Sequence, residues 1–137
     1  MRFIRYWLPA IVWMMAIFAL SGRSSVQVAQ EPIFNFIFFK TLHILEYALL
    51  YILFFRALKQ TVNSFSGFSI FVAAFLLTII YAATDEIHQT FVSTREGRAR
   101  DVIIDAIGAA AAWISLTHLL PRAPRKLRSL GKSWGLD

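Results

Sequence analysis

A chain of 137 residues is long enough for one compact unit but short for several domains. The absence of cysteine excludes disulfides, thiolate catalysis and cysteine metal ligands. The net charge of +6 lies at the ends of apolar blocks and not on one soluble basic face, which argues against a nucleic-acid partner and for a membrane protein.

Four apolar blocks predict four helices that cross a membrane, since a hydrocarbon layer roughly 30 Å thick takes about 20 helical residues. The blocks run from Phe3 to Leu20, from Phe34 to Leu58, from Phe68 to Ala83 with a helical continuation through Gln89, and from Val102 to Leu120. The predicted fold class is an all-α integral membrane four-helix bundle over residues 1–120. A basic tail follows over residues 121–137 and is predicted to lie in the cytoplasm near anionic head groups.

The first block has a second interpretation. Arg2 and Arg5 precede its apolar run, and Ala19 and Ser21 are spaced as in the cleavage site of a secretory signal. The apolar run is longer than a usual signal core and contains Pro9, which favours a retained membrane helix.

The basic residues predict the orientation of the bundle. In a four-helix zigzag, nine fall on the side of both termini: Arg2, Arg5, Arg56, Lys59, Arg122, Arg125, Lys126, Arg128 and Lys132. Five fall on the other side: Arg23, Lys40, Arg95, Arg98 and Arg100. The positive-inside rule then predicts both termini in the cytoplasm, in a multi-pass protein of the plasma membrane.

Polar residues interrupt the blocks on the side predicted to face outward. On the second helix, Lys40, His43 and Tyr47 fall within about 60° of one another, with Glu46 beside them. The third helix ends in a face that holds Asp85, His88 and Gln89, with Glu86 beside it. On the fourth, Asp101 and Asp105 share a strip with Gly108 and Ala112, whose small side chains allow another helix to pack closely.

These polar residues predict a site, because charge near the bilayer centre costs about 2.5 to 3.5 kcal/mol and usually marks function. A purely structural ion-pair network is the alternative, since buried charges need partners in any case. Asp101 also fits an N-cap of the fourth helix, and Tyr47 also fits a packing residue. Arg95 and Arg98 also fit a solvated loop or contacts with lipid phosphates.

The combined motifs resemble the VanZ-like membrane proteins. Three motifs show the resemblance. The first is K-x2-H-x3-Y (Lys40, His43, Tyr47), and the second is the serine-rich segment SGRSS at 21–25. The third is D-E-x-x-Q-x-F followed by arginines and D-x3-[N/D]-x2-G, here Asp85, Glu86, Gln89, Phe91, Arg95, Arg98, Asp101, Asp105 and Gly108. The resemblance covers about residues 8–118. This chain departs from the family pattern in VSTREG before the loop arginines and in Asp105, where asparagine is frequent. The family is named for a protein linked to resistance to teicoplanin, a lipoglycopeptide that acts at the outer face of the membrane.

Two functions remain open. In the first, an intramembrane hydrolase or transferase acts on a lipid-linked envelope substrate, with the catalytic set His43, Glu46, Asp85, Glu86, His88, Gln89, Asp101 and Asp105. Its possible cofactor is a divalent cation held by His43, Asp85, Glu86, His88 and Asp101, whose oxygen and imidazole ligands are of suitable type. A metal-free enzyme with Glu86 or His88 as the general base is the alternative. Lys40, Tyr47, Arg95, Arg98 and Ser24 bind the substrate. In the second, the same residues form a non-catalytic pocket for a lipid head group or a lipoglycopeptide.

Overall fold

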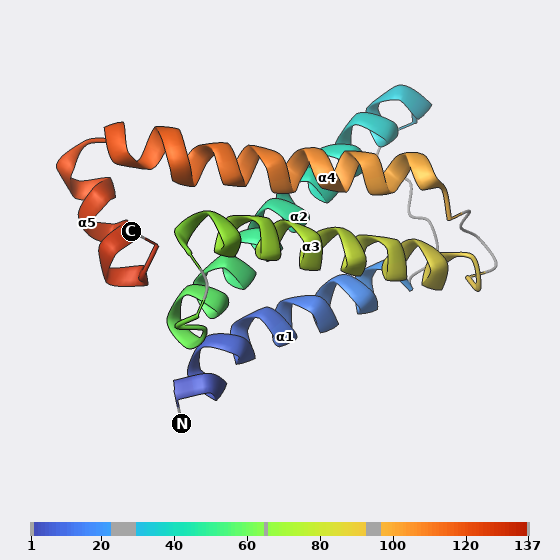
Figure 1. The fold of residues 1–137 in the computed structure, drawn as a ribbon. Helices are drawn as coiled ribbons and strands as arrows, with labels where there is room; N and C mark the ends of the chain where they lie inside the picture. The colour runs from blue at the N-terminus through green and yellow to red at the C-terminus, as the bar shows by residue number, and fades with distance from the viewer. Residues whose placement is uncertain (1, 23–29, 65, 93–96, 137) are drawn as a thin grey trace.

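The structure, a computed structural model, describes residues 2–22, 30–64, 66–92 and 97–136 (Figure 1). Its helices are α1 (Arg2–Ser21), α2 (Pro32–Thr61), α3 (Gly67–Gln89), α4 (Ala99–Ile114) and α5 (Arg125–Trp134). A π-helical segment, Ser115–Leu119, and a 3-10 turn, Leu120–Arg122, continue α4 toward α5. The described residues contain no strand, so the predicted all-α class is confirmed.

Four helices in the described residues are long and apolar enough to cross a membrane: α1, α2, α3, and α4 with its continuation to Arg122. Many of their large apolar side chains are exposed, as in a protein surrounded by lipid. The predicted four-helix membrane bundle is therefore confirmed. Helix α2 is longer than its apolar block, because Pro32 begins it in the first-turn position that suits proline.

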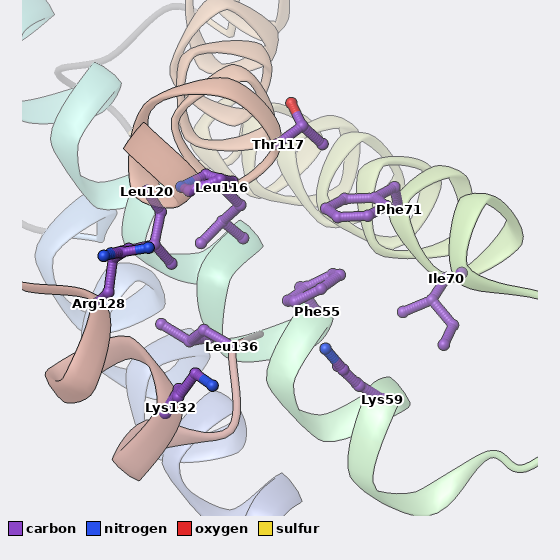
Figure 2. A pocket seen from close by; sticks show the side chains of 12 residues that line it. Phe55, Lys59, Ile70, Phe71, Leu116, Thr117, Leu120, Arg128, Lys132 and Leu136 are labelled. Atoms are coloured by element: carbon purple, nitrogen blue, oxygen red, sulfur yellow. The ribbon is translucent and has the colours of Figure 1, made fainter. Parts of the chain in front are cut away.

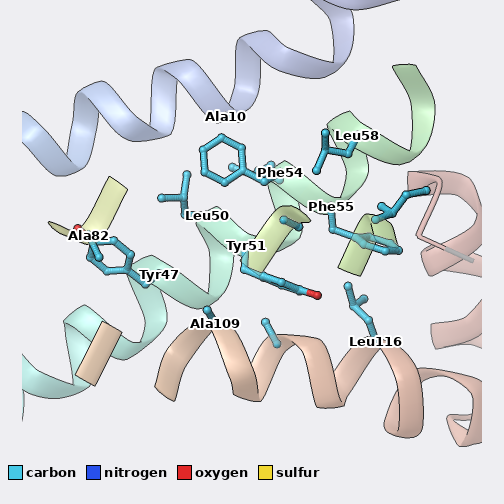
Figure 3. Close-up of a cluster of buried hydrophobic side chains, with 14 of the residues drawn as sticks. Ala10, Tyr47, Leu50, Tyr51, Phe54, Phe55, Leu58, Ala82, Ala109 and Leu116 are labelled. Atoms are coloured by element: carbon cyan, nitrogen blue, oxygen red, sulfur yellow. The ribbon is translucent and has the colours of Figure 1, made fainter. Parts of the chain in front are cut away.

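Helix α2 is the centre of the bundle and packs against α1, α3 and α4. In Figure 1 it crosses obliquely behind α3 and α4. Its buried side chains run from Tyr47 through Tyr51 and Phe54 to Leu58, and Figure 3 shows them between the other helices. The apolar core therefore lies along α2.

Side-chain hydrogen bonds link the spanning helices. The Trp13 indole donates to the main-chain oxygen of Glu46 at 3.0 Å, and the Trp7 indole donates to Thr61 Oγ1 at 3.1 Å, so both join α1 to α2. The Tyr81 hydroxyl donates to the Met14 oxygen at 2.5 Å and joins α3 to α1. Such bonds satisfy polar groups that lipid cannot satisfy.

The two ends of the bundle differ in charge. At one end lie the last turns of α1 and α3 and the first turns of α2 and α4, and the acidic residues there are Asp85 and Glu86 of α3 and Asp101 and Asp105 of α4. At the other end α5 folds back toward the last turns of α2 and the first turns of α3 (Figure 1). Arg56 Nε donates to the Trp134 oxygen at 2.7 Å, and Gln60 donates to the Gly135 oxygen at 3.4 Å, so α2 holds the end of α5. The chain can turn there because Gly135 adopts the left-handed φ of 73° that glycine tolerates.

The cytoplasmic placement of both termini stays a prediction. A reporter fused after Asp137 should read as cytoplasmic, and one inserted near Gly97 should read as external, because the sequence predicts nine basic residues on the side of the termini and five on the other. Enzymatic reporters of the two compartments measure this directly. The opposite readout would reverse the orientation of the whole bundle.

Candidate functional site

Two side-chain pairs join α2 to α4. Lys40 Nζ lies 2.7 Å from Asp101 Oδ2, and His43 Nδ1 lies 3.1 Å from Asp105 Oδ1. The spacing of three residues on α2 matches that of four on α4, since both place side chains on one helical face. Arg100 lies near the other oxygen of Asp101, at 3.7 Å. The two polar stripes predicted from the sequence therefore face each other.

Gly108 makes this pairing possible. A Cβ built on Gly108 would collide with the main-chain oxygen of Ile44, because the backbones of α2 and α4 approach closely there. Ala112, one turn further on, is also buried. Small residues allow such close approach in membrane bundles.

A second polar group joins α1 to α3. Ser21 Oγ donates to Asp85 Oδ1 at 2.6 Å, and Gln89 Nε2 donates to Asp85 Oδ2 at 3.0 Å. His88 stacks on Phe18 of α1, with ring centroids 3.8 Å apart, and its Nδ1 lies 3.5 Å from Ser21 Oγ. Both oxygens of the buried Asp85 carboxylate are thus satisfied by neutral donors.

Glu86 holds the start of α4 against the end of α3. Its Oε2 accepts a hydrogen bond from the main-chain amide of Arg98 at 2.8 Å. Gly97 lies so close that a Cβ there would collide with the Glu86 main-chain oxygen. The loop therefore needs glycine at this position.

Tyr47 lies between the two polar groups. Its side chain is fully buried, and its ring is nearly parallel to that of His43, with ring centroids 6.4 Å apart. Glu86 is buried at the same end of the bundle as Asp101 and Asp105. We call the whole set the polar cluster: Ser21, Lys40, His43, Tyr47, Asp85, Glu86, His88, Gln89, Asp101 and Asp105.

Four buried polar atoms of this cluster have no hydrogen-bond partner in the described parts of the chain: Tyr47 Oη, Glu86 Oε1, Asp101 Oδ1 and Asp105 Oδ2. Three of them are carboxylate oxygens, which accept hydrogen bonds when ionised. Buried polar atoms are nearly always paired in native proteins, so each exception needs an explanation.

The remaining predicted residues have the following positions. Glu46 is half-buried and its carboxylate interacts with His43. Arg98 is exposed, and its main-chain amide donates to Glu86 Oε2. Ser24 and Arg95 lie outside the described residues.

The interpretation of Asp101 as an N-cap is wrong. Helix α4 begins at Ala99 with Arg98 as its N-cap, so Asp101 lies within the first turn. Its carboxylate instead pairs with Lys40 on the neighbouring helix. The ion pair to a second helix outweighs the local cap that the sequence pattern favours.

The candidate cation ligands do not form one group. Among the residues that the structure describes, no three His, Asp or Glu side chains are arranged to hold a metal ion. His43 is bonded to Asp105 between α2 and α4, whereas His88 lies against α1. The divalent-cation site stays a prediction.

Sequence reasoning missed Ser21, which supplies the shortest bond to Asp85. Its signal was available, since Ser21 begins the serine-rich segment at the end of an apolar helix and can hydrogen-bond to a neighbouring helix. The prediction chose Ser24 within the same segment. Helical phase alone does not identify which serine faces the bundle where the helix ends.

Comparison with known proteins supplies one match. The family model described as VanZ/LLP1 matches residues 5–120, a range that contains all four spanning helices except for their outermost residues. No curated protein and no solved structure matches the chain.

Proposed function

The chain belongs to the VanZ/LLP1 family, and we propose that its polar cluster binds the hydroxyl- or ammonium-bearing head group of a lipid-anchored molecule of the cell envelope. The observation that carries this proposal is the set of three buried carboxylate oxygens, on Glu86, Asp101 and Asp105, that accept no hydrogen bond from the described residues; Arg100 Nε lies 3.7 Å from the one on Asp101. A ligand with several N–H or O–H donors satisfies such oxygens and offsets the cost of burying them.

The balance of charge supports a donor-rich ligand over an anionic one. Lys40 is already paired with Asp101 at 2.7 Å, and His43 with Asp105 at 3.1 Å. An anionic group placed beside Glu86, Asp101 and Asp105 would meet like charges. Amines and sugar hydroxyls can donate hydrogen bonds to these three carboxylate oxygens, and the Tyr47 hydroxyl can donate one to the ligand.

The position of the cluster supports a membrane-anchored ligand. The cluster lies at one end of four membrane-spanning helices, so a ligand with an acyl chain can reach it while the chain stays in the lipid. With both termini in the cytoplasm, this end faces the outer leaflet. The resemblance noted above makes an acylated glycopeptide such as teicoplanin one candidate ligand and glycopeptide resistance one candidate role.

Two isosteric variants test this proposal. Asp105→Asn and Glu86→Gln each replace an orphaned acceptor by an amide, and each should weaken binding about tenfold or more, since a hydrogen bond to a charged group contributes about 1.5–3 kcal/mol. The probe is teicoplanin, titrated into the full chain in nanodiscs of phosphatidylcholine. Glu31→Gln, which changes an exposed acid at the same end of α2, is the matched control and should bind as the wild type does. Equal affinity in all four proteins would contradict the proposal.

Proton transfer is the second candidate function, and the His43–Asp105 pair favours it. A carboxylate accepts, so the bonded Nδ1 of His43 carries the proton when Asp105 is ionised, and Nε2 is left to accept another. A histidine oriented by a carboxylate in this way is the usual general base of hydrolases. The substrate would be a phosphoester, acyl or glycosyl linkage of a lipid-linked molecule.

His43→Gln separates this function from binding alone. It should lower the turnover of a lipid-linked substrate by about 10²–10⁴-fold while leaving much of the affinity, since general base catalysis contributes that much to rate. Product release from radiolabelled membrane lipids by the purified protein measures the rate. An unchanged rate in this variant would remove His43 as the base.

A further inference from the structure

The end of the bundle opposite the polar cluster contains a pocket of about 590 Å³, within the range of about 300 to 1,000 Å³ typical of ligand sites. It lies between α5, the last turns of α2, the first turns of α3 and the continuation of α4, and we call it the α5 pocket. His43 and Lys59 are sixteen residues apart on α2, or about 24 Å along the helix. The α5 pocket is therefore separate from the polar cluster.

Its walls are apolar. Phe55 of α2, Ile70 and Phe71 of α3 and Leu116 after α4 line it, and Leu136 closes it from the chain end (Figure 2). Most of these residues belong to segments that span the membrane. An acyl chain can therefore enter the pocket from the surrounding lipid without passing through water.

Its rim is basic. Lys59, Arg128 and Lys132 line the pocket, and its lining contains no acidic residue. Figure 2 shows Lys59 and Lys132 extending toward each other from α2 and α5. Basic side chains above an apolar space are complementary to a molecule that has an anionic head and a hydrocarbon tail.

Helix α5 has the character of a helix that lies in the head-group region. Its leucines Leu127 and Leu130 and its Trp134 are about half exposed, at 52%, 57% and 49%, while Arg125, Lys126, Arg128 and Lys132 supply its charge. Amphipathic basic helices of this kind lie in the membrane interface, where lipid phosphates are found. The rim of the pocket is thus at the level of the phosphates.

We propose that the α5 pocket binds one anionic phospholipid, with the phosphate between Lys59 and Arg128 and an acyl chain against Phe55, Ile70 and Leu116. The main-chain oxygens of Trp134 and Gly135 fasten the end of α5 to α2 and so hold the basic wall in place. In a bundle with both termini in the cytoplasm, this pocket opens to the leaflet that is rich in anionic lipid.

Native mass spectrometry of the full chain tests this site. The protein is released from detergent in the presence of equal amounts of phosphatidylglycerol and phosphatidylcholine with identical acyl chains. We expect the wild type to retain one phosphatidylglycerol in at least fivefold preference, and the pair Lys59→Gln with Arg128→Gln to lose that preference. The matched control, Arg122→Gln with Arg125→Gln, removes two charges at the same end outside the pocket and should retain it.

Equal retention of the two lipids by the wild type would overturn the proposal. So would equal loss in both charge-removal pairs, because general attraction to the surface would then explain the preference. Gly67→Phe keeps every charge and places an apolar ring at the pocket, where a Cβ meets no atom within 4 Å. It should reduce phosphatidylglycerol retention at least fivefold. Displacement of the lipid by millimolar glycerol phosphate would show that the basic residues bind free phosphates, and would contradict the proposal that the pocket binds a phospholipid.

Discussion

Gly108→Leu should destabilise the protein by about 3 kcal/mol or more, the upper part of the range for overpacked sites. A Cβ at this position already collides with the main-chain oxygen of Ile44, and main chain in a helix cannot move aside as a flexible side chain does. The α2–α4 crossing would have to open, which would also separate Lys40 from Asp101 and His43 from Asp105. Unfolding in mixed micelles, followed by fluorescence of the four tryptophans, measures the free energy.

Ala111→Leu is the matched control for this variant. Ala111 lies on the same helix but is exposed to the lipid side, so a leucine there has room. It should leave the unfolding free energy within about 0.5 kcal/mol of the wild type, as surface substitutions usually do. Equal loss in the two variants would mean that close approach at Gly108 does not limit the fold.

Lys40→Met should cost about 3–5 kcal/mol, the loss expected when one partner of a buried ion pair is removed. The methionine keeps most of the apolar stem, so the change isolates the ammonium that lies 2.7 Å from Asp101. Arg100, at 3.7 Å from the other oxygen, is more than half exposed and compensates only in part. The same unfolding measurement applies.

The double variant Lys40→Met with Asp101→Leu should recover most of that stability, because a well-packed apolar pair often replaces a buried ion pair without loss. It should still bind ligand poorly, since the Asp101 oxygen that accepts no hydrogen bond is gone. Additive losses in the double variant would show that the two side chains are not coupled. Recovery of both stability and binding would reduce the pair to a structural role.

The helices were predictable because lipid imposes a simple rule on sequence. The predicted blocks Phe3 to Leu20 and Phe68 to Gln89 differ from α1 and α3 by single residues at their ends. The helical phase of His43 and Asp105 also predicted which sides of α2 and α4 carry the polar groups. A period of 3.6 residues is fixed by backbone geometry, so this inference does not depend on tertiary contacts.

The partners within the cluster were not predictable to the same extent. The bond from the Arg98 amide to Glu86 depends on the path of the loop, and no side-chain pattern encodes that path. The pairing of Asp85 with Ser21 depends on how α1 ends. Helix α5 was predicted only as a basic tail, because its ten residues are too short and too charged to resemble a spanning block.

The length of α2 makes the protein sensitive to the thickness of its bilayer. Its 30 residues extend for about 45 Å, whereas the hydrocarbon layer measures roughly 30 Å, so α2 must tilt or project beyond it. The other spanning helices have 20 to 24 residues and fit the layer more closely. Lys40 and His43 lie in the first half of α2 and Lys59 lies in its last turn, so a change of its tilt moves the two groups in opposite directions. We therefore expect a change of lipid chain length to shift the residues of α2 in the polar cluster and in the α5 pocket at the same time.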